Sequence, residues 1–271
     1  MKIIIIGWGS IGHRHTQNLR LLQPDAHLII ADPYCIQPGP GQLFYRDWRR
    51  ALADHGDAGG CIIASPTAHH LEQLMEAAHA GIPVYCEKPL LSVADYRQLA
   101  VEHLLPTLPL YARHVCGFQY FFHPHMPQVA DLARRHGELA FSGQDALLER
   151  YGPNVGEIMV AHPLATALRY LGAAQSAALV SDGVRLRGSV THLAGVSYYD
   201  FDMGAGPRQS WVRAARRKVE LGASDSMYSD CLAAWLRWVA GGPSDARLSD
   251  LALGLEVSRI LSEVLLTESA R

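Results

Sequence analysis

Short apolar runs alternate with longer amphipathic stretches along the first half of the chain. Residues 2–6 (KIIII) form a mainly β-branched run, which is typical of a strand buried on both faces. A helix is expected from about Ser10 to Leu22, and a second strand at His27–Ala31. The pattern then predicts a helix at 49–55, a strand at 60–64, a helix at 69–80, a strand at 83–87, a helix at 92–103 and a strand between 108 and 119. This alternation predicts an α/β fold with a doubly wound parallel sheet, which binds ligands at the carboxyl ends of its strands.

The second half of the chain has a weaker, strand-like pattern. Apolar residues alternate with polar ones in several places between 174 and 222, which predicts several antiparallel strands. Helices are expected at 226–240 and 249–268, the latter with strongly periodic apolar positions. A length of 271 residues favours two domains, and we expect them at 1–120 and 121–271.

The first strand leads directly into a glycine-rich turn, GWGSIG. Gly7, Gly9 and Gly12 have the G-x-G-x-x-G spacing, and an acid, Asp32, follows the last of them by twenty positions. The first glycine permits a tight bend, the second lets the backbone approach a pyrophosphate, and the third lets the helix pack against the strand. The phosphates then lie at the helix amino terminus, and the acid accepts hydrogen bonds from a ribose. The motif predicts dinucleotide binding; the alternative is a turn that only packs a helix.

Asp32 also bears on which dinucleotide binds. A carboxylate at this position repels a 2′-phosphate, and Pro33-Tyr34-Cys35 offers no cation to receive one. The sequence therefore favours NAD over NADP. Arg14 weakens this preference, because it is close enough to the turn to contact a phosphate.

The composition excludes several classes of function. Apolar residues make up 49% of the chain and charged residues 18%, which allows a substantial core and argues against disorder. A formal net charge of −2 provides no electrostatic footprint for nucleic acid or an anionic membrane, and no apolar run approaches the roughly 18–20 residues that span a bilayer. The start, MKIIIIG, is too short an apolar stretch for a signal peptide, and five scattered cysteines without a CxxC pair argue for reduced thiols. We therefore expect a cytoplasmic protein that acts on small molecules.

Three of the expected strand ends carry candidate chemistry. They are GWGSIG at 7–12, ASPTAHH at 64–70 and CEKP at 86–89. Because the strands are expected to be parallel, these segments should meet at one edge of the sheet.

Together these segments resemble the Gfo/Idh/MocA oxidoreductases, a family that includes glucose–fructose oxidoreductase and inositol dehydrogenase. The likeness rests on GWGSIGHRHTQNL at 7–19, IIASPTAHH at 62–70, Glu87-Lys88-Pro89 and FQYFFHP at 118–124, in the family's order and spacing. It covers the first 125 residues well and is loose beyond them. It implies an N-terminal Rossmann domain and a smaller C-terminal α/β domain with an open, mostly antiparallel sheet, whose C-terminal helices pack back on the first domain.

The resemblance also implies an activity and a set of cofactor contacts. Family members usually oxidise a hydroxyl of a sugar, cyclitol or sugar nucleotide, or catalyse the reverse reduction. The implied contacts come from the glycine turn, the acid and the later strand ends: Gly7, Gly9, Ser10, Ile11, Gly12, Asp32, Ser65, Pro66, His70, Glu87 and Lys88.

Lys88 matches the lysine of the family's EKP signature, which orients the substrate and tunes proton transfer at the reacting oxygen. A lysine beside a cationic nicotinamide gives up its proton more readily, which suits acid–base catalysis. The alternative is a solvated strand-end lysine that pairs with Glu87.

His162 falls where the family's second-domain histidine is expected, and the resemblance implies that it relays the substrate's proton. The family aspartate four residues earlier is replaced by Ile158, and a frequent acid three residues later by Ala165. Glu157 is close in sequence, but five helical residues correspond to about 140° of rotation, so it could contact substrate only from an irregular turn. The family arginine after the domain crossover is replaced by Phe121. The alternative for His162 is a hydrogen-bonded histidine at a helix start.

Other candidates have weaker claims. Tyr120 and Trp8 could line the substrate cleft. A basic run at 213–218 is expected to be a solvated face, with contact to a nucleotide phosphate as the alternative. No acid or cysteine accompanies the histidine pairs at 69–70 and 123–125, so no metal site is expected.

These features favour an NAD(P)-dependent oxidoreductase in which Lys88 and His162 handle protons. A reductase of a C=N or C=C bond on a non-carbohydrate substrate stays open, because the missing aspartate matters less there. A catalytically degenerate cofactor-binding partner or sensor also stays open, since the family aspartate and arginine are both lost. We expect a homodimer or homotetramer, because an open sheet usually buries its exposed face against a second subunit.

Overall fold

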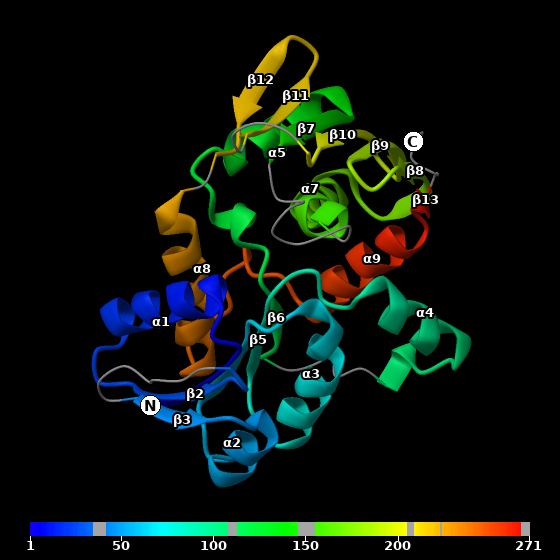
Figure 1. Ribbon diagram of the computed structural model, residues 1–271. Helices are drawn as coiled ribbons and strands as arrows, with labels where there is room; N and C mark the ends of the chain where they lie inside the picture. Colours follow the sequence, from blue (N-terminus) through cyan, green and yellow to red (C-terminus); the bar gives the residue numbers. More distant parts are fainter. Residues whose placement is uncertain (35–41, 108–112, 146–154, 205–208, 223, 267–271) are drawn as a thin grey trace. The chain divides into compact units, whose positions relative to one another are not determined.

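The computed structural model describes residues 1–34, 42–107, 113–145, 155–204, 209–222 and 224–266 (Figure 1). At 155–158, 225 and 265–266 the description covers the backbone alone. The chain forms two compact units. The first contains Met1–Gln119 and Asp225–Leu255, and the second contains Tyr120–Ser224 and Glu256–Arg271.

The first unit is built on a six-stranded parallel sheet in the order β3-β2-β1-β4-β5-β6. Its strands are β1 (Lys2–Ile6), β2 (His27–Ala31), β3 (Gln42–Tyr45), β4 (Gly60–Ile63), β5 (Val84–Cys86) and β6 (Val115–Cys116). The four isoleucines of β1 are at most 2% exposed, which confirms the expected central strand. The strand order reverses between β1 and β4, so the crevice of this sheet opens beside the glycine turn.

Helices connect these strands as the alternation predicts. They are α1 (Ser10–Leu22), α2 (Trp48–Asp54), α3 (His70–His79) and α4 (Val93–Val101), with the short 3-10 helices η1 (Thr67–His69) and η2 (Leu105–Thr107). A further helix, α8 (Asp225–Val239), joins this unit from a distant part of the chain. Its Trp235 packs so close to β4 that a Cβ on Gly60 would lie 2.6 Å from the indole ring.

The second unit is built on a mixed, mostly antiparallel sheet in the order β12-β11-β7-β10-β9-β8-β13. Its strands are β7 (Glu138–Gln144), β8 (Ala174–Ser181), β9 (Arg185–His192), β10 (Gly195–Asp202), β11 (Gln209–Ala214), β12 (Arg217–Glu220) and β13 (Leu265–Leu266). The pairs β7–β10 and β8–β13 are parallel, and the others are antiparallel. Both sheets together confirm the predicted α/β fold class.

Two helices of the second unit pack against its sheet: α5 (Met126–His136), which ends at the left-handed Gly137, and α7 (Val155–Leu171). The 3-10 helix η3 (Gln119–Phe122) precedes them. No helix within the described residues is both long and apolar enough to cross a membrane.

One predicted helix is wrong at its end. The pattern predicted a helix at 249–268, but α9 (Leu251–Ser262) stops at Ser262 and Leu265–Leu266 pair with β8 instead. An apolar run satisfies either structure, and here the free edge of β8 supplies the partner that makes it a strand.

Candidate functional site

The glycine turn after β1 is shaped by backbone contacts. Gly7 has a φ of +99°, and a Cβ there would lie 2.5 Å from the Ser65 nitrogen. A Cβ on Gly12 would lie 2.0 Å from the Gly7 carbonyl oxygen. A Cβ on Gly9 would meet nothing within 4 Å. Gly7 and Gly12 therefore serve the packing of the turn, whereas the space over Gly9 is open for a ligand.

The start of α1 suits an anion. Gly9 is the N-cap residue and supplies no side chain to bond the first helical amides, and the first turn contains no acidic residue. The amides at a helix start carry the positive end of the helix dipole. With the open space over Gly9, this turn fits the pyrophosphate of a dinucleotide.

Asp32, at the end of β2, is tied to the same turn. The Trp8 backbone N–H donates to Asp32 Oδ2 at 2.7 Å, and the Tyr34 backbone N–H donates to Oδ1 at 2.8 Å. A carboxylate oxygen can accept more than one hydrogen bond, so these two bonds are compatible with a further bond from a ribose hydroxyl. These bonds fix the carboxylate beside the glycine turn, where the spacing predicted it.

Two nearby side chains turn toward protein partners. The Arg14 guanidinium lies over the Tyr228 ring of α8, 4.6 Å from its centroid. The Trp8 indole packs edge-on against His13, with centroids 4.2 Å apart. The structure thus gives Arg14 a partner in α8 of the same unit, and its contact with a phosphate stays a prediction.

The segment after β4 is braced by His70. Its Nε2 lies 2.9 Å from the Ser65 carbonyl oxygen and its Nδ1 lies 3.0 Å from the Pro89 carbonyl oxygen. Both partners are acceptors, so a neutral ring can donate to only one of them at a time. Burial lowers the pKa of His70, although the two carbonyls partly oppose this. His70 is 1% exposed and links the segments that follow β4 and β5.

Glu87, at the end of β5, is buried rather than open to solvent. Its Oε1 lies 2.7 Å from His15 Nε2 of α1 and 2.7 Å from Gln119 Nε2. Gln119 Nε2 also donates to the Tyr85 hydroxyl at 2.9 Å, and that hydroxyl lies 3.5 Å from Cys231 Sγ. Sequence reasoning missed His15 and Gln119; each lies within a quoted motif, yet nothing in the sequence pairs them with Glu87.

Lys88 lies between two anchored neighbours. The Glu87 backbone N–H donates to the Ile63 carbonyl at 2.9 Å, and the Pro89 carbonyl is held by His70. Lys88 itself is half-buried. Its backbone is therefore fixed at the edge where Ser65 and the glycine turn also lie, at the carboxyl ends of β4 and β1.

In the second unit, His162 is in the middle of α7 and not at a helix start as the alternative reading expected. It is 5% exposed. The Tyr120 ring of η3 stacks on its imidazole, with centroids 4.2 Å apart and planes 2° from parallel. Helix α7 covers residue 157 as well, so the irregular turn that Glu157 would need is absent at the backbone level; its side chain lies outside the described residues.

Phe121, the residue after Tyr120, also contacts a side chain of α7 through its ring. The Arg169 guanidinium carbon lies 3.6 Å from the centroid of the Phe121 ring. Arg169 follows His162 by seven residues, two helical turns, so both lie on one face of α7. Position 121 thus carries no cation of its own but holds the guanidinium of Arg169, which sequence reasoning did not single out.

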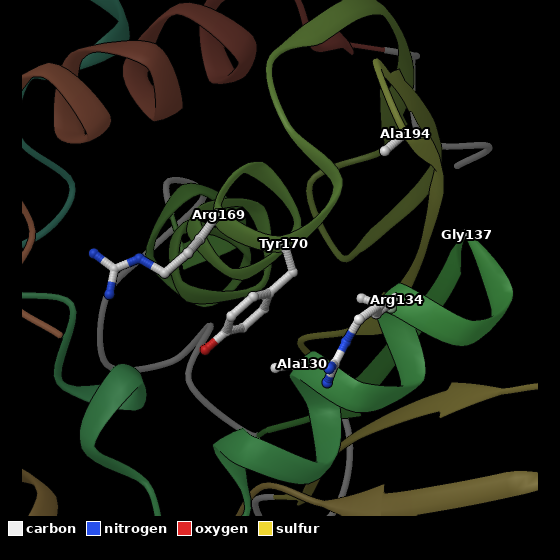
Figure 2. Close-up of a pocket in the computed structure, with 7 residues that line it drawn as sticks. Ala130, Arg134, Gly137, Arg169, Tyr170 and Ala194 are labelled. Carbon is white, nitrogen blue, oxygen red and sulfur yellow. The ribbon is translucent and has the colours of Figure 1, made fainter. Parts of the chain in front are cut away.

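A hollow of about 450 Å³ lies beside this arginine (Figure 2). Residues of α5 and α7 line it, together with Gly137 and Ala194, and its polar groups come from Arg134, Arg169 and Tyr170. Figure 2 shows the Tyr170 ring extending from α7 toward Ala130 of α5. Burial raises the pKa of Tyr170, and the charge of Arg169 partly counteracts this.

The histidine pair at 123–125 is held by hydrogen bonds to the backbone. His123 Nε2 donates to the Gly222 carbonyl at 3.0 Å, while its Nδ1 accepts from the His125 backbone N–H. No group of three or more potential metal ligands occurs among the described residues.

The basic run lies on the exposed hairpin of β11 and β12, where Lys218 Nζ lies over the Trp211 ring. Cys61, Cys86, Cys116 and Cys231 are buried free thiols, and Cys35 lies outside the described residues.

Comparison with known proteins agrees with this geometry. Residues 1–103 match the family model described as "Oxidoreductase family, NAD-binding Rossmann fold", the Gfo/Idh/MocA family. This segment is therefore similar to the NAD-binding Rossmann domain of that family. The match covers the glycine turn, Asp32, Ser65, His70 and the EKP segment.

Curated relatives align with the first part of the chain. An inositol 2-dehydrogenase of Pseudarthrobacter chlorophenolicus is 29% identical over 109 residues, 38% of this chain and 32% of the relative. An uncharacterized oxidoreductase, YrbE, of Bacillus subtilis is 31% identical over 144 residues, 50% of this chain and 40% of the relative. The chain thus spans well under half the length of these relatives.

Solved structures are similar over nearly the whole chain. The WlbA dehydrogenase of Thermus thermophilus, in complex with NAD and UDP-GlcNAcA, has a TM-score of 0.77 at 15% identity and covers 100% of this chain and 97% of its own. A myo-inositol dehydrogenase of Corynebacterium glutamicum has a TM-score of 0.74 at 16% identity and covers 96% of this chain and 94% of its own. At these identities the likeness shows that both units share the fold of these dehydrogenases.

Proposed function

We propose that this protein is an NAD(H)-dependent oxidoreductase that moves a hydride to or from a carbinol carbon of a sugar, cyclitol or sugar nucleotide. The observation that carries the proposal is the glycine turn: open space over Gly9, uncapped amides at the start of α1, and Asp32 fixed to the turn by the Trp8 N–H. Structures of similar fold contain NAD, and one of them also contains a sugar nucleotide. The first unit is the dinucleotide-binding domain in this proposal, and the second binds substrate.

The bound nicotinamide would supply the hydride acceptor, and the protein must manage the proton. Oxidation of a carbinol breaks a C–H bond, whose electron pair leaves with the hydride, and an O–H bond, whose proton goes to a base. We assign Lys88 to orient and hold the substrate oxygen and His162 to accept the proton. The Tyr120 ring keeps the imidazole of His162 in one plane.

The preference for NAD follows from Asp32. Its carboxylate can accept bonds from both ribose hydroxyls and would repel a 2′-phosphate. The guanidinium of Arg14, the cation near the turn, lies on the Tyr228 ring of α8.

The open face of the second sheet supports a homo-oligomer. Side chains of β10 alternate between buried and exposed, and Tyr198 on the outer face is 45% exposed. We propose that a second copy covers this face in a homodimer or homotetramer. Four buried free thiols suit a reducing compartment such as the cytoplasm.

A fluorescence titration with NADH and NADPH tests the cofactor assignment. We expect quenching of Trp8 and energy transfer to the nicotinamide at low NADH concentration, and weak binding of NADPH. Binding of neither nucleotide would contradict the proposal and favour the reading of a partner protein without catalysis.

Lys88→Ala tests the chemistry. With myo-inositol and sugar nucleotides as the first substrates screened, we expect turnover to fall by about 100-fold or more while the Kd for NADH changes little, because Lys88 acts on the reacting oxygen. Unchanged turnover would remove Lys88 from the mechanism. NADH binding without turnover of any alcohol calls for a screen of C=N and C=C substrates.

A further inference from the structure

The carboxylate of Glu87 is buried and hydrogen-bonded inside the first unit. Its Oε1 has two donors at 2.7 Å, His15 Nε2 from α1 and Gln119 Nε2 from η3. His15 and Gln119 are each 0% exposed, and Glu87 is 7% exposed. Two hydrogen bonds from separate elements leave this oxygen little freedom to move.

The donors are themselves held in place. The second N–H of Gln119 donates to the Tyr85 hydroxyl, and the Tyr85 ring packs edge-on against His15 with centroids 5.1 Å apart. The Tyr85 ring also packs edge-on against Trp235 of α8, with centroids 5.7 Å apart. We refer to His15, Glu87, Gln119 and Tyr85 as the buried clamp.

The clamp includes two buried polar atoms that lower the stability of the folded protein. His15 Nδ1 and Gln119 Oε1 are buried, and neither has a hydrogen-bond partner among the described residues. An unsatisfied buried polar atom is unfavourable and rare in folded proteins. Apolar residues could fill the same space without this cost, so the clamp calls for an explanation other than stability.

Burial favours the neutral form of several titratable groups near Glu87. Its charge acts on titratable groups from α3, β5, β6 and α8, namely His70, Tyr85, Cys86, Cys116 and Cys231. Burial lowers the pKa of the histidine and raises the pKa values of the phenol and the thiols. The nearest cation along the chain is Lys88, the next residue, whose charge also acts on Cys116.

We propose that His15 and Gln119 are positioning residues that hold the Glu87 carboxylate inside the first unit and thereby set the orientation and charge environment of Lys88. This inference rests on the proposed role of Lys88 in proton handling. When both donors are present, the carboxylate is directed toward α1 and η3. When one donor is lost, the carboxylate is freed to approach the ammonium of Lys88, and an opposite charge nearby stabilises the protonated form.

The lysine content of the chain makes this testable without a substrate. There are three lysines, Lys2, Lys88 and Lys218. In full-length protein labelled with ¹³C at the lysine ε-carbon, NMR resolves each one and follows its titration with pH. Lys2, which pairs with Asp57, and Lys218, which lies over Trp211, serve as internal references.

Four variants define the experiment. His15→Leu and Gln119→Met each remove a donor at nearly constant volume, and we expect the titration midpoint of Lys88 to rise by about one pH unit in each. His15→Gln keeps an N–H donor and should restore much of the wild-type midpoint. His79→Gln, which changes an exposed histidine on α3, should shift none of the three lysines.

A double-mutant cycle separates positioning from general loosening of the fold. In a Glu87→Gln background no carboxylate is left to release, so adding Gln119→Met should no longer move the Lys88 midpoint. The proposal is overturned if the Lys88 midpoint is the same in wild type and in folded Gln119→Met, or if the shift persists in the Glu87→Gln background.

The Lys88 titration and the turnover of Lys88→Ala test the clamp and the proposed reaction separately. A shifted Lys88 midpoint combined with full turnover of Lys88→Ala would establish the clamp and reject the catalytic role of Lys88. An unshifted midpoint combined with lost turnover in Lys88→Ala would retain the reaction and reject the clamp.

Discussion

In the glycine turn of the first unit, two of the three motif glycines are needed for packing and the third leaves space open for a ligand. Gly7 and Gly12 face backbone atoms at distances that no Cβ tolerates, whereas Gly9 faces open space. The spacing of the motif predicted these roles, because each follows from backbone geometry that the same short segment creates. The position of Asp32 could be predicted for the same reason. It follows Gly12 by twenty residues at the end of the next strand, and this short unit restricts where its side chain can lie.

Gly9→Ala and Gly12→Ala should therefore fail in different ways. Gly9→Ala is expected to leave the thermal midpoint unchanged and to raise the Kd for NADH about tenfold or more, because its methyl group enters the space that we assign to the pyrophosphate. Gly12→Ala is expected to destabilise the fold by about 1–3 kcal/mol, because its methyl group meets the Gly7 carbonyl. Thermal unfolding and NADH titration of both variants check this, and equal NADH affinity in wild type and Gly9→Ala would contradict it.

At the scale of elements, the sequence pattern predicted best the buried strands at the start of the first unit and the helix between them. It found β1, β2 and α1 with the observed bounds. It missed β3, an edge strand of four residues with mostly half-exposed side chains. It also missed β7, in which the inward positions include Gly143 and so contrast little with their polar neighbours.

Helix α8 shows what local patterns cannot supply. The sequence pattern predicted the helix, but it could not predict that the helix packs against β4. Trp235 is fully buried, donates its indole N–H to the Arg113 carbonyl at 3.2 Å and lies against Gly60 of β4. A glycine in that strand and a tryptophan 175 positions later form one contact.

Trp235→Ala should destabilise the first unit strongly. We expect a loss of about 3–5 kcal/mol in the free energy of unfolding, because a large buried ring is replaced by a cavity. Trp235→Phe keeps most of the volume and should cost less. Chemical denaturation monitored by circular dichroism measures both, with Trp238→Phe, a half-exposed tryptophan of the same helix, as the control. A Trp235→Ala midpoint equal to that of the control would show that α8 does not support the sheet.

At the scale of the whole molecule, both units contain histidines that burial keeps uncharged. Burial lowers the pKa values of His70 and His114 in the first unit and of His123 and His192 in the second. In the unfolded chain these side chains titrate near 6.5. Below that pH the unfolded chain binds protons that the folded chain does not, so stability decreases as the pH falls.

We therefore expect the thermal midpoint to be lower at pH 5.5 than at pH 7.5. The loss should begin as the pH passes below about 6.5 and should be smaller in His192→Asn, which removes one of the four groups. Differential scanning fluorimetry across this range provides the measurement. A midpoint that stays constant or rises on acidification would contradict the assignment of these histidines as neutral in the folded protein.

The sequence by itself determined the class of the fold, the glycine turn and the strand ends that carry Ser65, Glu87 and Lys88. These features arise within short segments, where period, glycine spacing and turn chemistry act directly on the backbone. Tertiary structure alone decided that Glu87 is bonded by His15 and Gln119, that His162 lies under Tyr120 and that Arg169 lies on Phe121. These partners are between 32 and 72 positions apart. Contacts of that kind depend on how helices pack on sheets, and no local pattern of apolar and polar residues specifies them.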